Sequence, residues 1–180
     1  MTPVDLLNDA FQRVLQTATD AVDGLTPEQL AHRPGPDANP IGWLVWHLAR
    51  VQDDHVADVA GTEQVWTEHG FADRFDLPFD VTAIGYGQTS EEVGQVHVEA
   101  DLLADYLRAV HEQTTSYLAT LTADDLDRVV DTRWDPPVTA AVRLVSVIGD
   151  ALQHSGQAAY VRGLAERRAS AWHQSGAADR

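Results

Sequence analysis

Apolar residues recur every three or four positions along four long stretches of this chain, and that period restricts its fold more than any other feature. The stretches span residues 3–22, 41–60, 99–121 and 138–168. A repeat of this kind places the apolar side chains on one face of an α-helix, and no strand pattern competes with it. Four such helices in a short chain predict an all-α fold, a four-helix bundle around one core.

The connections between the predicted helices indicate how the bundle is arranged. At 180 residues the chain is long enough for one sizeable core. We therefore expect a single bundle domain over residues 1–168 and a weakly ordered C-terminal tail over residues 169–180. A long irregular crossover, residues 61–97, joins the second and third helices. Its length predicts that these two helices run parallel and that the crossover helps to wall a pocket.

The composition excludes several kinds of partner and chemistry. With 28 acidic and 12 basic residues the formal net charge is −16, which repels nucleic acid and anionic membrane surfaces. There is no cysteine, so any thiol that the protein uses must come from another molecule. Because neither a signal peptide nor a membrane-spanning stretch is visible, we expect a cytoplasmic protein with no membrane partner. All 12 basic residues are arginine, which indicates a GC-rich, actinobacterial source.

Three side chains form a candidate metal site. Asp150 and His154 are four residues apart on the fourth predicted helix, so they project from one face about 6 Å apart. His47, on the second helix, can supply a third ligand. Two imidazoles and one carboxylate would hold a tetrahedral zinc ion with its fourth position open, as in catalytic zinc sites. The alternative is that His47 is a hydrogen-bonded core histidine and that the pair binds no metal.

His55 competes with His47 for the third ligand position, because both lie on one face of the same predicted helix. Eight residues separate them by ~12 Å along the helix axis, which is too far for both to reach one ion easily. We choose His47 because Trp43 and Val51 place it on the apolar stripe, whereas residues 53–55 have the pattern of a helix surface.

Two segments carry a family resemblance, residues 39–49 (NPIGWLVWHLA) and residues 142–157 (VRLVSVIGDALQHSGQ). They resemble the DinB-like superfamily, in particular its mycothiol S-transferase-like branch, and the resemblance covers residues 4–166. The superfamily's usual ligands, one histidine on the second helix and a His-x-x-x-His pair on the fourth, map to His47, Asp150 and His154. The aspartate resembles the branch that includes mycothiol-dependent maleylpyruvate isomerase and related thiol transferases. That isomerase has an additional C-terminal domain for which this chain leaves no room, so a transferase is favoured.

The resemblance implies a metal-dependent, most simply zinc-dependent, thiol S-transferase that forms a homodimer. We expect a low-molecular-weight thiol such as mycothiol to bind as a thiolate and to attack a small electrophile held under the crossover. The predicted substrate contacts are Trp66 and Trp134, which lie outside the predicted helices, and Gln157, which can orient a ligand. No residue is identified as a general base. Two alternatives remain: a non-catalytic metal-binding helical dimer, and a hydrolase that uses metal-bound water.

Overall fold

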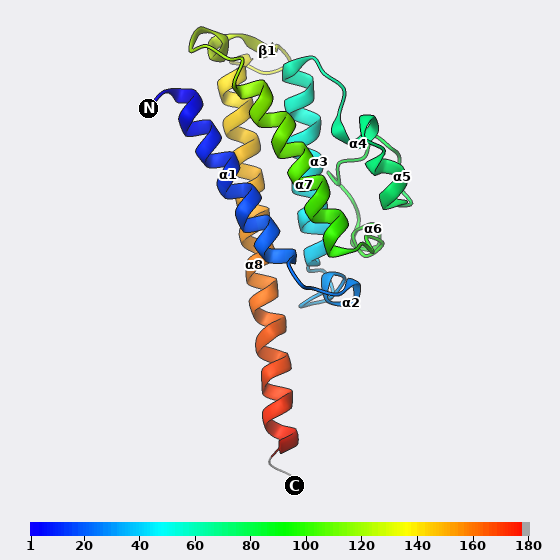
Figure 1. The fold of residues 1–180 in the computed structure, drawn as a ribbon. Coiled ribbons are helices and arrows are strands. Elements are labelled where there is room, and N and C mark those ends of the chain that lie inside the picture. Colours follow the sequence, from blue (N-terminus) through cyan, green and yellow to red (C-terminus); the bar gives the residue numbers. More distant parts are fainter. Residues whose placement is uncertain (178–180) are drawn as a thin grey trace.

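The computed structural model describes residues 1–177, and their side chains as far as Arg167. Within that part of the chain the four predicted long helices are present. They are α1 (Pro3–Val22), α3 (Ile41–Ala60), α7 (Ala100–Leu118) and α8 (Ala140–Ala177). The four pack side by side as a bundle (Figure 1). The predicted all-α, four-helix architecture is therefore confirmed.

Capping residues fix where two of the helices begin. The Thr2 side chain accepts a hydrogen bond from the backbone N–H of Asp5, and the Asp5 carboxylate accepts one from the backbone N–H of Thr2. This reciprocal capping box satisfies donors that the first turn of α1 would otherwise leave unpaired. A second capping box at Thr26 starts the short helix α2 (Pro27–Leu30).

The direction of the helices agrees with the length of the crossover. In Figure 1, α3 and α7 run in one direction, whereas α1 and α8 run in the opposite direction. Both α7 and α8 pack against α1, and both also pack against α3, so α1 and α3 occupy opposite corners of the bundle. The prediction that the second and third long helices are parallel is thus confirmed.

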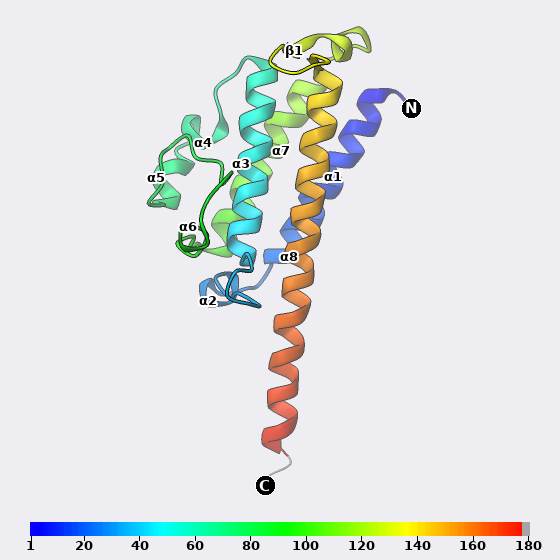
Figure 2. The same cartoon turned by 180° about the vertical axis from the view of Figure 1, so that it is seen from behind.

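The crossover contains three short helices and covers the outer side of α3. They are α4 (Val65–Glu68), α5 (Phe71–Phe75) and α6 (Ser90–Val93), and they lie beside α3 and α7 in Figures 1 and 2. Because α3 lies between the other bundle helices and this layer, most of its side chains are buried. Buried aromatic residues fill the space between the two layers: Trp46, Trp66, Phe71, Phe75 and Tyr106.

The end of the bundle opposite α2 carries elements that the sequence pattern does not reveal. A 3₁₀ turn, η1 (Asp124–Asp127), leads into an antiparallel pair of strands, β1 (Val129–Asp131) and β2 (Val138–Thr139). Strands this short contain too few residues for an alternating pattern to be recognised.

The strand β2 moves the start of the fourth long helix from residue 138 to Ala140. That helix, α8, then continues past the predicted end at residue 168 to Ala177. Of the predicted tail, residues 178–180 lie outside the described residues, and weak order in the tail stays a prediction. None of the helices within residues 1–177 has the length and apolar character needed to cross a membrane.

Candidate metal centre

The three predicted ligands converge between α3 and α8. Figure 2 shows these two helices side by side and running in opposite directions. His47 comes from the middle of α3 and is 5% exposed, whereas Asp150 and His154 lie one turn apart on α8. One candidate ligand atom from each residue lies within 4.8 Å of the other two. Donors around a tetrahedral zinc ion lie about 3.3 Å apart, given bonds of about 2.0 Å, so small side-chain movements would bring the cluster to that spacing.

The imidazole of His47 is held in a defined orientation. Its Nδ1 hydrogen bonds to the backbone carbonyl oxygen of Ile84, and because a carbonyl only accepts, Nδ1 carries the proton. The ring stacks on the indole of Trp43, with centroids 4.6 Å apart and planes 13° from parallel. Burial lowers the pKa of His47, an effect that the hydrogen bond to Ile84 partly offsets. The ring is thus neutral at physiological pH and has a free lone pair on Nε2.

His154 is oriented in the same manner by a neighbour on its own helix. Its Nδ1 donates to the amide oxygen of Gln157 at 2.9 Å, so this ring also carries its proton on Nδ1. Its Nε2 lies 3.6 Å from Oδ1 of Asp150, which is too long for a hydrogen bond. The Gln157 side chain therefore orients a candidate ligand, as the sequence suggests it can. Whether Gln157 also contacts a substrate stays a prediction.

Asp150 provides the test of whether these residues suit a cation. Its Oδ2 atom is buried and has no hydrogen-bond partner among the described residues. A buried carboxylate oxygen without a partner costs free energy, and a bound cation would remove that cost. Two neutral imidazole nitrogens and a carboxylate oxygen are also the donor types that zinc takes in three-ligand sites. The residues present therefore fit a divalent cation of the zinc type.

The crossover contacts the cluster directly, and the sequence pattern gave only a partial signal of this. Gly85 has a φ angle of +91°, and a Cβ atom at this position would lie 2.7 Å from Nδ1 of His47. The side chain of Gln88 accepts a hydrogen bond from the indole N–H of Trp43 at 2.7 Å. The segment 84–88 thus covers the His47 side of the cluster, and the pair of glycines at 85 and 87 is the sequence feature that marks it.

His55 takes no part in the cluster. Within the described residues the group that can hold an ion contains only His47, Asp150 and His154. The Nδ1 atom of His55 instead lies 3.6 Å from Oδ2 of its neighbour Asp54. The apolar stripe favoured His47 over His55 as the third candidate ligand. The geometry agrees with that choice, because His47 lies beside Asp150 and His154.

Asp53 corrects one part of that interpretation, because it does not lie on the helix surface. It is 1% exposed and accepts hydrogen bonds from the backbone N–H groups of Val65 and Trp66 at 2.9 and 2.8 Å. The hydroxyl of Tyr106 donates a third at 2.8 Å, and the guanidinium of Arg50 lies 3.5 Å away. These contacts replace the water that a surface aspartate would bind.

Arg50 extends the same buried network to the part of the crossover that covers the cluster. Its Nε donates to the carbonyl oxygen of Ala83 at 3.2 Å, one residue before the partner of His47. Another of its nitrogens donates to the side-chain oxygen of Gln64 at 2.9 Å. The guanidinium also lies over the ring of Trp66, 4.8 Å from the centroid. Arg50 therefore anchors the start of the crossover and its 83–88 segment to α3.

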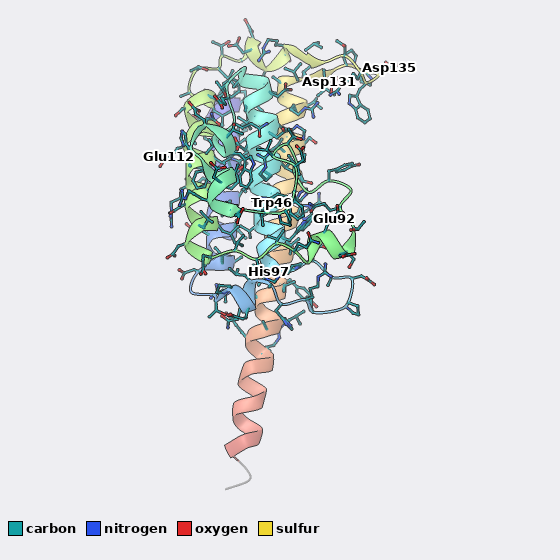
Figure 3. All side chains as sticks on the ribbon, turned by 90° about the vertical axis from the view of Figure 1, so that its right-hand side faces the viewer. Trp46, Glu92, His97, Glu112, Asp131 and Asp135 are labelled. Atoms are coloured by element: carbon teal, nitrogen blue, oxygen red, sulfur yellow. The ribbon has the colours of Figure 1, made fainter. Side chains whose placement is uncertain are left out.

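The two tryptophans predicted as substrate contacts lie in different places. Trp66 is buried between Phe75 and Tyr106, and with Trp46 it lines a cavity of about 240 Å³ under the crossover. Trp134 is 66% exposed. The next residue, Asp135, lies at the outer tip of the β1–β2 connection, far from Trp46 in Figure 3. The structure does not bring Trp134 to the cluster, and a role in substrate binding for either tryptophan stays a prediction.

Known proteins give this geometry a context. The model of the mycothiol-S-transferase family matches residues 6–166. A conserved protein from Enterococcus faecalis is 34% identical, with a TM-score of 0.84, over 90% of this chain and 96% of that chain. A DinB-like protein from Bacillus cereus, 18% identical with a TM-score of 0.60 over 89% of this chain and 91% of that chain, shares the fold. No curated protein matches the chain.

Proposed function

Because this chain belongs to the mycothiol-S-transferase family, we propose that it is a metal-dependent thiol S-transferase. In this proposal His47, Asp150 and His154 hold one divalent cation, and zinc is the ion best suited to two imidazoles and a carboxylate. The cosubstrate is a low-molecular-weight thiol such as mycothiol. The second substrate is a small electrophile that accepts the thiol sulfur.

The observation that carries the proposal is that two hydrogen bonds fix the same tautomer in both histidines. The carbonyl of Ile84 and the amide oxygen of Gln157 each hold a proton on Nδ1, which leaves both Nε2 lone pairs free. A hydrogen bond of this kind is the usual accompaniment of a metal-binding histidine, because it orients the ring and raises its basicity. The partnerless Oδ2 of Asp150 supports the same assignment.

The chemistry divides between the bound ion and the protein. When bound, the cation would supply the positive charge that lowers a thiol pKa from about 8.5 and so makes a thiolate available at neutral pH. His47, kept neutral by burial, supplies an uncharged donor. A divalent cation held by two neutral imidazoles and one carboxylate would therefore retain a net positive charge. In the reaction a sulfur lone pair forms the S–C bond, the leaving group departs with its bonding electrons, and the thiol proton passes to solvent.

The first test of the proposal is metal content. Purified protein loaded with zinc and then desalted should retain the metal stoichiometrically. The variants His154→Ala and Asp150→Asn should lose it, and circular dichroism would show whether they remain folded. His69→Ala is the matched control, because that ring is half exposed and lies outside the cluster. Full retention of zinc by a folded His154→Ala variant would refute the ligand assignment.

The second test is the dependence of activity on thiol. The zinc-loaded protein would be given a fluorogenic electrophile with mycothiol, with glutathione or with no thiol. We expect product only when a thiol is present, and much less product from Asp150→Asn. Product without thiol would instead identify a hydrolase. Zinc binding without any product would identify a module in which the metal only joins α3 to α8.

A further inference from the structure

A polar cavity of about 430 Å³ lies beside α3, on the hairpin side of the metal cluster. That volume falls within the range of small-molecule sites. Its polar lining includes Asp54, His55, Asp58, Gln64, Arg133 and Arg143. Figure 3 shows Asp131, the ion-pair partner of both arginines, at the end of the bundle where α8 begins.

The cavity and the metal cluster share the interface between α3 and α8. His55 lies two turns after His47 on α3, and Arg143 lies two turns before Asp150 on α8. Because the two helices run in opposite directions (Figure 2), both steps lead toward the same end of the bundle, over about 11–12 Å. The charges of Asp54, Asp58 and Asp150 all raise the pKa of His55, against the stronger lowering by burial and by Arg143. The separation between the cavity and the cluster is therefore within the length of one extended small molecule.

The lining mixes hydrogen-bond donors with acceptors, and this decides the chemical class of the ligand. Arg133 and Arg143 each lie 2.9 Å from Oδ2 of Asp131, so their positive charge is already paired. An anion would meet the carboxylates of Asp54 and Asp58, and a cation would meet the two guanidiniums. A hydroxyl group both donates and accepts, so a neutral group with several hydroxyls can pair with every side of this cavity.

One donor in the lining still lacks a partner. The Nε atom of Arg143 is buried and makes no hydrogen bond to the described residues. A buried N–H group without an acceptor is costly, and a ligand hydroxyl would satisfy it.

We propose that this cavity binds the polyhydroxylated, sugar-like part of the thiol cosubstrate, and that it thereby selects which thiol the enzyme uses. The inference rests on the proposed function, because it requires the thiol sulfur to sit at the metal cluster. His55 and Asp58 determine specificity in this arrangement. They lie two or more turns from His47 and do not touch the reacting atoms.

The first experiment measures binding without any reaction. A thiol-free probe, the sugar part of mycothiol alone, is titrated into the protein by isothermal calorimetry. We expect saturable binding that His55→Gln and Asp58→Asn each weaken about tenfold, as expected for the loss of one hydrogen bond to the ligand. The matched controls His69→Gln and Asp101→Asn lie outside the cavity and should bind as the wild type does. Absence of binding, or equal binding by all variants, overturns the inference.

The second experiment separates sugar recognition from catalysis. The same variants are assayed with mycothiol and with N-acetylcysteine, which carries a thiol and no sugar. We expect the KM for mycothiol to rise about tenfold while kcat, and both constants for N-acetylcysteine, stay close to those of the wild type. Equal changes for the two thiols, in an active enzyme, overturn the inference. A wild-type protein inactive with every thiol refutes the proposed function instead, and the calorimetry then decides on the cavity by itself.

Discussion

A Cβ atom at Gly85 would lie 2.7 Å from Nδ1 of His47, closer than two such atoms can approach. The backbone of Gly85 also has a φ angle of +91°, which side-chain-bearing residues rarely adopt. Position 85 thus requires glycine for two separate reasons. One is the local turn, and the other is the imidazole packed directly beneath it.

Substitution of Gly85 by alanine should weaken zinc binding about 10- to 100-fold, because the added methyl group displaces His47 from its carbonyl partner. Competition with a chromogenic chelator measures the affinity. Gly87→Ala is a matched control, since Gly87 has a φ angle of +74° but open space around it. The same loss in both variants would show that backbone strain, rather than contact with His47, controls the site.

Removal of the Gln157 amide should also lower zinc affinity, by about tenfold or more, because Nδ1 of His154 loses the acceptor that fixes its tautomer. The comparison is with Gln153→Ala, an exposed glutamine one turn earlier on α8. The folded state should be equally stable in both variants. If Gln157→Ala binds zinc as the wild type does, the hydrogen bond has no part in metal binding.

Replacing Asp150 with asparagine should stabilise the metal-free protein while abolishing its response to zinc. The change removes a charge whose Oδ2 atom has no partner, and it removes a candidate ligand. We expect a Tm a few degrees above the wild type without zinc, measured at pH 8 by calorimetry, and little rise on adding zinc. A lower Tm in the metal-free variant would indicate that Asp150 already has a stabilising partner.

The buried pair of Arg50 and Asp53 should be the most sensitive polar element of the core. Asp53→Asn leaves Arg50 without its counter-charge, and we expect a loss of about 3–5 kcal/mol in the free energy of unfolding. Tyr106→Phe removes only one donor to Asp53 and should cost about 1–3 kcal/mol. Urea denaturation measures both, with Asp101→Asn as an exposed control. A cost for Asp53→Asn no larger than that of the control would contradict this account.

Asp131 should stabilise the fold at neutral pH and lose that effect in acid. Hydrogen bonds from Arg133, together with the charges of Arg133 and Arg143, hold the pKa of Asp131 well below its usual value. A carboxylate with a depressed pKa in the folded state stabilises it above the unfolded pKa of about 3.9, and protonation below that removes the effect. The Tm difference between wild type and Asp131→Asn should therefore be large at pH 6 and shrink from pH 4 downward. A constant difference would point to packing instead.

The long helices were predictable from their periodicity, their directions from the length of the crossover, and the pairing of Asp150 with His154 from their spacing along one helix. His47 was identifiable by its apolar neighbours. The burial of Asp53 was not, because its partners come from α4 and α7, and a pattern that counts aspartate as a surface residue cannot include them. The same limit applies to Ile84, whose backbone carbonyl acts on His47 whatever side chain it bears.

Trp134 shows the limit of placing a residue by its position in a connection. Its position outside the predicted helices made it a candidate for a pocket, but a large aromatic residue in a connection can equally be left in solvent. Whether Trp134 lines a pocket or lies in solvent depends on the path of the β1–β2 connection. That path depends on contacts such as the hydrogen bond from Arg143 to Asp131.

The hydrogen bond from His47 to the Ile84 carbonyl couples the candidate ion site to the conformation of the 83–88 segment. Opening of the 83–88 segment would break this bond, and the imidazole would then be free to rotate and to move its proton to the other nitrogen. By thermodynamic reciprocity, an ion that binds better to the closed segment must also lower the population of the open one. Amide hydrogen exchange in residues 83–88 should therefore report occupancy of a site to which those residues contribute no ligand atom.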